Sequence, residues 1–377
     1  MNMITRTIEN RIYERMQPNK VMLLFGPRRV GKTVLMRNII NNTPGNHLIL
    51  NGEDYDTLTL LEPQSIANYR KLLDGIDLLA IDEAQNITDV GKKLKLIVDE
   101  VPGIRVIATG SSSFDLQNKA GEPLVGRSSR FQLHPFSQQE LGNQENTLST
   151  RQNLEERLIY GAYPELISIS NLNRKKEYLR DIINSYLLKD ILMIDGVKNS
   201  RKMMDLLRLI SYQTGSEVSY DELGKHLGLS RNTVERYLDL LSQVFIIYRA
   251  GAFSRNLRKE ISKGAKWYFY DNGIRNAIVN EFKALQVRND IGVLWENYLM
   301  SERIKLLSNR GDETQHYFWR TYDGQEIDLI EAAGNKVSAF EFKWGDKHKK
   351  APRAFADNYT DATYQVINQQ NYLDFIT

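Results

Sequence analysis

A short glycine-containing loop between an apolar strand and a helix constrains this chain more than any other feature. Residues 21–25 form an apolar run of buried-strand length, and in residues 34–40 the apolar positions recur at helical spacing. Between them the sequence fits the pattern G-x-x-x-x-G-K-[ST], with residues Gly26, Pro27, Arg28, Arg29, Val30, Gly31, Lys32 and Thr33. A strand, this loop and a helix in that order predict a site that binds phosphate groups.

The residue types of the loop indicate how a nucleoside triphosphate would be held. Gly26 and Gly31 let the backbone turn so that successive N–H groups point at phosphate oxygens. We expect Lys32 to contact the β- and γ-phosphates and the Thr33 hydroxyl to bind Mg²⁺. The predicted cofactors are therefore ATP and Mg²⁺.

A second apolar run, residues 78–81, follows Asp77 and leads into two adjacent carboxylates, Asp82 and Glu83. In a parallel sheet the carboxyl end of such a strand lies beside the phosphate loop. We expect Asp82 to hold Mg²⁺, through water, and Glu83 to polarise the attacking water. The alternative is that the pair caps a helix at a strand-to-helix turn.

A third apolar run, residues 105–110, ends in hydroxyl residues. Either Thr109 or Ser111 could sense the γ-phosphate, and we favour Ser111. The alternative is that these hydroxyls form a turn only.

Together these segments resemble the AAA-superfamily ATPases of prokaryotes. The resemblance is carried by residues 26–33, 81–85 and 109–113, followed by residues 126–131 and 135–141. More narrowly, the chain resembles bacterial and archaeal ATP-binding proteins that carry a C-terminal restriction-endonuclease-like domain of unknown function. The resemblance implies a possible homo-oligomer in which Arg127 or Arg130 acts as a finger on a neighbouring subunit's γ-phosphate. Alternatively, either arginine pairs with a surface carboxylate.

Length and composition predict several globular domains and exclude some classes of protein. At 377 residues the chain exceeds one typical hydrophobic core, so we expect two to four domains. The absence of cysteine excludes disulfides, thiolate zinc sites and cysteine nucleophiles. No apolar run is long enough to cross a bilayer and the first residues lack a signal-peptide core, so we expect a cytoplasmic protein without a membrane partner.

The pattern of elements predicts an α/β fold in four parts. Residues 1–145 would form a P-loop NTPase unit with a parallel sheet, and residues 146–215 a helical lid. Residues 216–275 would form a winged helix, and residues 276–377 an α/β restriction-endonuclease-like domain.

Within the third part, residues 219–234 have the pattern of a helix-turn-helix, with Ser219 and Ser230 as N-caps and Gly228 between the helices. DNA is therefore a possible partner, contacted by Arg231, Asn232 and Arg236 on the second helix and by Arg255, Arg258, Lys259 and Lys263 in the wing. Winged helices also pack against proteins, and acidic residues share the exposed surface of the second helix. DNA contact and protein packing both stay open.

The last hundred residues contain Glu296 in a helix, Asp328 in one strand and Glu341 with Lys343 in the next. This set looks like the PD-(D/E)XK nuclease signature, although Asp328 lacks the preceding proline. The three carboxylates would hold Mg²⁺ at a scissile phosphate, and Lys343 would orient the water or stabilise the developing charge. Two alternatives are a solvent-exposed Glu341–Lys343 pair and a fold that binds nucleic acid without cutting it.

These observations favour a Mg²⁺-dependent ATPase coupled to DNA binding or processing. The alternative is a nucleotide-dependent switch or scaffold whose C-terminal part binds a partner without cleavage. Stimulation of ATP hydrolysis by DNA would distinguish the two.

Overall fold

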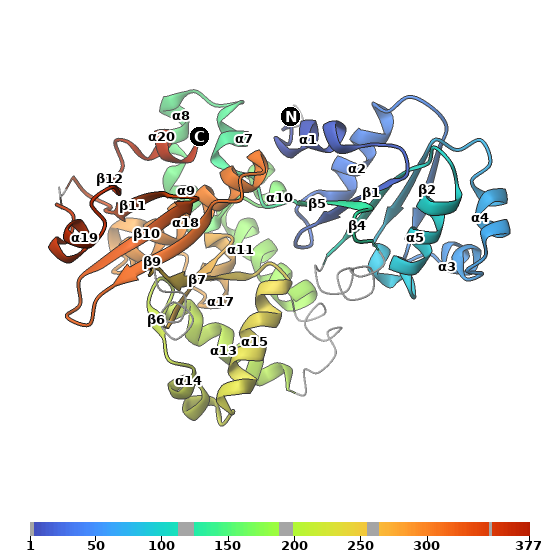
Figure 1. Ribbon diagram of the computed structural model, residues 1–377. Helices are drawn as coiled ribbons and strands as arrows, with labels where there is room; N and C mark the ends of the chain where they lie inside the picture. Colours follow the sequence, from blue (N-terminus) through green and yellow to red (C-terminus); the bar gives the residue numbers. More distant parts are fainter. Residues whose placement is uncertain (1–3, 112–123, 188–198, 255–263, 347–348) are drawn as a thin grey trace. The chain divides into compact units, whose positions relative to one another are not determined.

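The structure is a computed structural model that describes residues 4–111, 124–187, 199–254, 264–346 and 349–377 (Figure 1). The chain divides into two compact units, which are described separately below. One comprises residues 2–134 with 243–245, and the other comprises residues 135–242 with 246–377. No helix among the described residues is both long and apolar enough to cross a membrane.

The first unit is built on a parallel sheet with the strand order β2-β3-β4-β1-β5. Its strands are β1 (Lys20–Phe25), β2 (His47–Asn51), β3 (Leu78–Asp82), β4 (Arg105–Gly110) and β5 (Ser128–Gln132). Its helices are α1 (Ile8–Arg15), α2 (Lys32–Asn41), α3 (Tyr55–Leu61), α4 (Ile66–Leu72), η1 (Ala84–Asn86) and α5 (Val90–Glu100). The interior strands β1, β3 and β4 are buried along almost their whole length, as expected for a parallel sheet covered on both faces.

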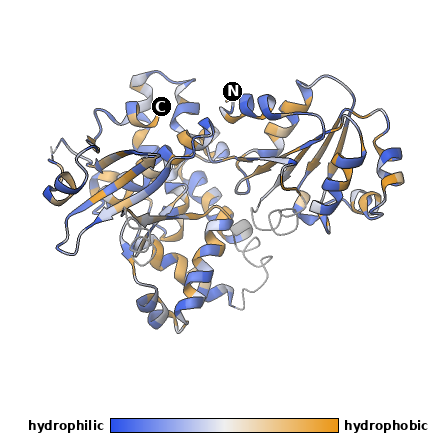
Figure 2. Cartoon of the chain, viewed as in Figure 1, coloured by the Kyte–Doolittle hydropathy of each residue, from blue (hydrophilic) through white to orange (hydrophobic). Residues whose placement is uncertain are grey.

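The second unit contains a seven-stranded mixed sheet with the order β12-β11-β10-β9-β7-β8-β6. Its strands are β6 (Glu217–Val218), β7 (Ile247–Ala252), β8 (Ala265–Phe269), β9 (Gln315–Arg320), β10 (Glu326–Ala333), β11 (Lys336–Phe342) and β12 (Thr363–Ile367). Its first helices are α7 (Gln138–Gly142), α8 (Thr147–Gln152), α9 (Leu154–Tyr160), α10 (Pro164–Ser168), α11 (Leu172–Asp181) and η2 (Ile182–Leu187). The others are α13 (Ser200–Tyr212), α14 (Tyr220–Leu227), α15 (Arg231–Gln243), α17 (Asn272–Ile278), η3 (Leu285–Val287), α18 (Ile291–Arg310), α19 (Arg353–Asn358) and α20 (Tyr372–Ile376). In Figure 2 the helices carry hydrophobic and hydrophilic residues on different sides, as expected for helices that pack on a core.

The seven-stranded sheet joins segments that the sequence analysis assigned to different domains. β7 pairs in parallel with β9, with Gly251 opposite Tyr317 and Ala252 opposite Phe318. Strands of the predicted winged helix and of the predicted C-terminal domain therefore belong to one sheet. The sequence analysis divided these residues between two parts, whereas the structure joins them. The backbone hydrogen bonds of β7 are completed by β9, a strand some 65 residues later in the chain.

The helix pair α14–α15 begins and ends at the residues that the sequence indicates. The side chain of Ser219 accepts a hydrogen bond from the backbone N–H of Glu222, and Gly228 ends α14 in the left-handed conformation. Ser230 accepts a hydrogen bond from the N–H of Thr233. The following strand begins only at Ile247, because Phe245 has a positive φ of 60° inside a turn. The predicted wing residues Arg255, Arg258, Lys259 and Lys263 lie outside the described residues.

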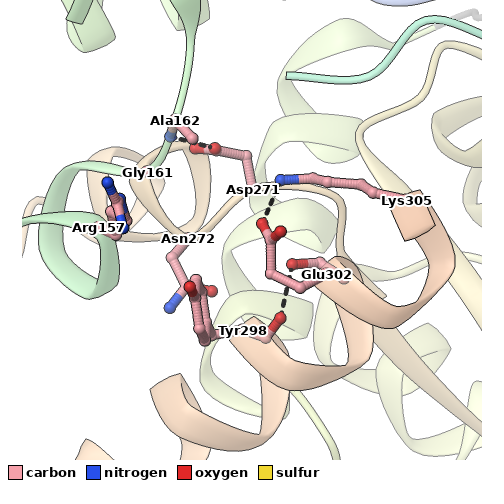
Figure 3. Close-up of a pocket in the computed structure, with 9 residues that line it drawn as sticks. Arg157, Gly161, Ala162, Asp271, Asn272, Tyr298, Glu302 and Lys305 are labelled. Atoms are coloured by element: carbon pink, nitrogen blue, oxygen red, sulfur yellow. Dashed lines mark hydrogen bonds and ion pairs between the residues drawn. The ribbon is translucent and has the colours of Figure 1, made fainter. Parts of the chain in front are cut away.

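A buried polar network fixes the segment that begins the second unit. Glu302 of α18 accepts hydrogen bonds from the backbone N–H of Gln138 at 2.5 Å and from Lys305 at 2.7 Å. Lys305 also donates to the carbonyl oxygen of Phe136 at 3.2 Å. Figure 3 shows Glu302 and Lys305 beside Asp271, around a small cavity. Because buried charges are stable only when they are paired, this network fixes one position for the segment after His134.

Gly161 lies in the sharp turn after α9, next to the same network. Its φ is 74°, and a Cβ atom there would come within 2.0 Å of the Asp271 carboxylate. The Asp271 carboxylate accepts a hydrogen bond from the N–H of Ala162 at 2.8 Å. Glycine at position 161 therefore allows the turn to approach Asp271.

Candidate functional site

The phosphate loop has the backbone conformation that its sequence predicts. Gly31 is the N-cap of α2 with a φ of 94°, and Gly26 has a φ of 155°. A Cβ atom on Gly26 would lie 2.2 Å from the carbonyl oxygen of Leu133, so only glycine fits. The buried ammonium group of Lys32 donates to the carbonyl oxygens of Gly26 at 2.9 Å and of Pro27 at 3.0 Å. Lys32 thus lies over the loop that would surround the phosphates.

The structure brings the two predicted Mg²⁺ ligands of the first unit together. The hydroxyl of Thr33, in the first turn of α2, donates to the carboxylate of Asp82 at 2.7 Å. Thr33 follows β1 and Asp82 ends β3, with β4 between these two strands in the sheet. Because parallel strands end at the same edge, residues 49 positions apart in the sequence meet there.

Glu83 lies beside this pair in an uncommon backbone conformation. Its φ of 49° is in the left-handed region, which non-glycine residues adopt at functional sites and in tight turns. Its N–H donates to the hydroxyl of Thr109 at 3.1 Å, and its carboxylate accepts a hydrogen bond from Gln85 at 2.5 Å. The Thr109 hydroxyl in turn donates to Asp82. The position of Glu83 is therefore fixed from both sides.

The two hydroxyl residues at the end of β4, Thr109 within it and Ser111 just after it, have different partners. Thr109 is completely buried and bonds to Asp82 and to the backbone of Glu83. Ser111, which the sequence analysis favoured, accepts a hydrogen bond from Gln85 at 3.3 Å. The sequence analysis did not identify Gln85, although it follows Glu83 by only two residues. A role for Ser111 at the γ-phosphate stays a prediction.

The predicted finger arginines do not lie at the phosphate-loop edge of their own sheet. Arg127 precedes β5, its carbonyl accepts a hydrogen bond from Val21 at the start of β1, and its side chain pairs with Asp99 at 2.6 Å. Arg130 is exposed on β5 opposite Leu23. Because β1 and β5 are parallel, Arg127 is at the end of β1 that is remote from the loop. A contact of either arginine with a γ-phosphate, on its own or on another subunit, stays a prediction.

The four predicted residues of the C-terminal site lie together in the second unit. Glu296 is on α18, Asp328 on β10 and Glu341 on β11, and Lys343 follows directly after β11. Lys343 pairs with Glu341 at 2.7 Å. Asp328 lies where the pairing of β10 with β9 is irregular, between Ile327 and Ile330, and such irregularities re-aim side chains beside active sites.

The carboxyl group of Asp328 is strongly affected by its surroundings. It is buried near Glu296 and Glu341, and burial followed by repulsion from these two carboxylates raises its pKa to about 8. It accepts a hydrogen bond from the N–H of Phe342 at 2.7 Å. Burial also raises the pKa of Glu296. No group of three or more His, Asp or Glu side chains among the described residues is placed to hold a metal ion.

The sequence analysis missed the cations that lie on these carboxylates. Lys266 of β8 is buried, pairs with Glu296 at 3.7 Å and also pairs with Glu326. Lys349 donates to Glu341 at 2.6 Å. The one local signal in the sequence is that Lys266 lies within the apolar segment of β8. Lysine is rarely buried unless it is paired, so a lysine at such a position indicates a partner of opposite charge.

The surface that was predicted to contact DNA is exposed on α15. Arg231, Asn232 and Arg236 are all exposed, and Arg231 lies 3.4 Å from Asp221 of α14 in an exposed pair. Glu235 is exposed on the same helix. DNA contact through this face stays a prediction.

Comparisons with protein families agree with the first unit's geometry. Residues 18–142 match the family described as an AAA domain. Residues 151–285 and 291–374 match two domains of unknown function, DUF8612 and DUF4143. Residues 18–142 of this chain are therefore similar to AAA domains, which agrees with the phosphate loop described above. The C-terminal matches carry no described function, so the winged helix and the nuclease-like domain stay predictions.

Similar whole chains and structures add little about function. An uncharacterized protein from Mycobacterium tuberculosis is 25% identical over 328 residues, which cover 86% of this chain and 70% of that protein. An uncharacterized protein from Methanocaldococcus jannaschii is 25% identical over 353 residues, covering 88% of this chain and 76% of that protein. The RuvB Holliday junction branch migration motor from Thermotoga maritima has a TM-score of 0.29 at 19% identity, covering 61% of this chain and 82% of that chain. A katanin structure has a TM-score of 0.29 at 15% identity, covering 53% and 76%. At such low TM-scores neither structure supports a conclusion about this chain.

We predict that Thr109→Val lowers the rate of ATP hydrolysis about tenfold or more while ATP binding is little changed. Valine has nearly the same shape but removes the hydrogen bonds of the Thr109 hydroxyl to the half-buried Asp82 carboxylate and Glu83 N–H, which costs about 1–3 kcal/mol. Phosphate release measures the rate, and a fluorescent ATP analogue measures binding. Thr109→Ser keeps the hydroxyl and should retain most activity, and Thr59→Val, on the exposed side of α3, is the matched control. Full activity of Thr109→Val would contradict this role.

Proposed function

We propose that this protein binds ATP with Mg²⁺ and hydrolyses the γ-phosphate bond. The observation that carries the proposal is the hydrogen bond from Thr33 to Asp82 at 2.7 Å, with Glu83 held beside it. A phosphate loop alone would support nucleotide binding only. Hydrolysis is supported because the phosphate loop lies beside the carboxylate of Asp82 and the oriented carboxylate of Glu83.

The residues present fit the cofactor. A hydroxyl and a carboxylate oxygen within hydrogen-bonding distance are a donor set that suits Mg²⁺, which prefers oxygen ligands and keeps several waters. Thr33 and Asp82 would hold the ion, whose charge would stabilise the phosphate oxygens. Lys32 would contact the phosphates, and Glu83 would accept the proton of the attacking water.

We predict that Lys32→Ala weakens ATP binding by about tenfold or more, since a hydrogen bond to a charged group contributes about 1.5–3 kcal/mol. Glu83→Gln should leave binding nearly unchanged but lower turnover by about 10²–10⁴-fold, the usual contribution of a general base. Equilibrium binding and single-turnover hydrolysis separate the two effects.

Two exposed residues of the same unit provide matched controls for these substitutions. Lys95→Ala on α5 and Glu14→Gln on α1 change the same residue types at exposed positions away from the site and should behave like wild type. Hydrolysis by Glu83→Gln at the wild-type rate would show that this carboxylate does not act on the water.

We also propose that hydrolysis requires an arginine from a second copy of the chain. The motivation is that Arg127 lies at the end of β1 remote from the phosphate loop and that the exposed Arg130 lies in the middle of β5, so neither starts beside the loop of its own chain. An arginine finger contributes about 10³–10⁵ to the rate in enzymes that use one.

We predict that Arg127→Ala or Arg130→Ala abolishes most hydrolysis, and that mixing the inactive variant with Lys32→Ala chains restores part of it. The mixture joins an intact phosphate loop from one chain with an intact arginine from the other. Phosphate release from the mixture, compared with each variant alone, measures the effect. Activity that is independent of protein concentration, with no rescue on mixing, would exclude a finger supplied by a neighbour.

A second proposed function is action on DNA by the second unit. It is favoured by two contacts, since Lys343 pairs with Glu341 and Asp328 accepts a hydrogen bond from the N–H of Phe342, the residue after Glu341. The exposed basic residues of α15 also favour it. The Oε2 atom of Glu341 is buried and has no hydrogen-bond partner among the described residues. A Mg²⁺ ion between Asp328 and Glu341 would satisfy this atom, and its chemistry would be to polarise a phosphate. The role proposed for Lys343 is to stabilise the developing charge.

We predict that the protein cleaves DNA in Mg²⁺ or Mn²⁺, and that Asp328→Asn removes cleavage while ATP hydrolysis is unchanged. Linear, branched and single-stranded DNA are incubated with each metal, with and without ATP, and the products are resolved on a gel. Asp357→Asn, an exposed aspartate of α19, is the matched control. Absence of cleavage, or equal cleavage by Asp328→Asn, would exclude the nuclease and leave a nucleotide-dependent switch whose second unit binds a partner.

A further inference from the structure

An open cleft in the second unit lies outside the sites described above. Its volume is about 350 Å³, which is at the lower end of the range for small-ligand pockets and suits one ring-sized group. The buried side chains of Leu154 and Leu285 contribute to its apolar lining. The cleft therefore combines an apolar surface with access from solvent.

Two of the lining residues follow the ends of parallel strands. Trp344 is two residues past the end of β11, and Gln369 is two residues past the end of β12. β11 and β12 are parallel neighbours, with Phe342 opposite Ile367. Ligands collect at the carboxyl ends of parallel strands, because the loops there diverge and leave a crevice.

Trp344 gives the cleft a flat aromatic surface. The other three tryptophans, at positions 267, 295 and 319, are buried, whereas Trp344 is only partly buried. Its ring packs edge-to-face on Trp295 with 5.3 Å between the ring centroids, which fixes its orientation. A partly buried and oriented indole is suited to stacking against a second flat ring.

The polar lining is made mainly of carboxamides. Gln152, Gln286 and Gln369 each offer a donor and an acceptor, which matches a ring whose edge carries both. The Glu155 carboxylate accepts hydrogen bonds from the backbone of η3 at 3.2 Å and from Gln286 at 3.4 Å. Arg151 adds an exposed positive charge at the cleft.

We propose that this cleft binds one unstacked base of single-stranded nucleic acid. The base stacks on Trp344, its edge bonds to the carboxamides, and an adjoining phosphate pairs with Arg151. A base pair within a duplex cannot present a free face to the indole, so duplex DNA is excluded from this site.

The cleft is separate from the carboxylate cluster. Phe342 packs on Phe375 and Trp344 packs on Trp295, whereas Glu341 and Lys343 pair with each other. Base binding therefore requires neither cleavage by the cluster nor hydrolysis of ATP. It is a further property of the second unit and does not rest on either proposed function.

The test titrates the full chain with a short oligothymidylate in EDTA, following tryptophan fluorescence and, with a labelled strand, anisotropy. We expect the strand to quench Trp344 and the same strand paired with oligoadenylate to bind much more weakly. Trp344→Ala should raise Kd about 5- to 150-fold, the range for a lost base–aromatic stack. Trp344→Phe keeps a ring, so it should lose the quenching while raising Kd much less.

Exposed side chains provide variants that should fold normally. Arg151→Gln should raise Kd and reduce the salt dependence of binding by about one phosphate contact. Arg353→Gln, whose side chain is 93% exposed on α19, is the matched control and should change neither. The titration contains EDTA and no ATP, so neither metal-dependent cleavage nor ATP hydrolysis contributes to it, which separates this proposal from the other two. No quenching by the strand, equal quenching by the duplex, or unchanged Kd in both Trp344→Ala and Arg151→Gln would overturn it.

Discussion

The hydrogen bond between Thr33 and Asp82 depends on the parallel register of three strands. β1 pairs with β4 and β4 with β3, and the three strands end at one edge of the sheet. The pairing of Ile81 with Ala108 places the next residues, Asp82 and Thr109, opposite each other. A slip of one residue would turn each side chain to the other face and separate the loop from its carboxylates. The chemistry of the first unit is therefore set by register as much as by residue type.

Because these contacts depend on strand register, only the local part of the site could be predicted from the sequence. The conformation of the phosphate loop is set locally, because its glycines, lysine and threonine lie within one turn of backbone. This conformation agrees with the prediction. The Asp-Glu pair was also recognisable, because it ends an apolar run. The partners of Thr109 could not be read from the sequence, because they are 26 and 27 residues away and depend on which strands are neighbours. Ser111 was equally plausible from its position alone.

In the second unit the sequence indicated the helices and strands better than their assembly. The caps of α14 and the strands around Asp328 and Glu341 follow from local patterns. The joining of β7 to β9 does not, since a parallel pair between distant segments has no local signature. Lys266 shows the consequence. In the sequence, Lys266 is one of several cations in a basic segment. In the structure, the shared sheet buries it against Glu296 of α18, a helix later in the chain.

The carboxylate cluster is close to electrically neutral without any added ion. With its pKa raised to about 8, Asp328 is mostly protonated at neutral pH. Lys266, Lys343 and Lys349 already pair with Glu296, Glu326 and Glu341, and Arg320 also lies 4.0 Å from Glu326. A divalent cation between Asp328 and Glu341 would have to displace the proton of Asp328 or move a lysine away from Glu341, because the charge is already compensated. Lysine rearrangement would be favoured where a DNA phosphate offers the displaced ammonium group a new partner. In that case metal and DNA would bind the cluster together more readily than either binds alone.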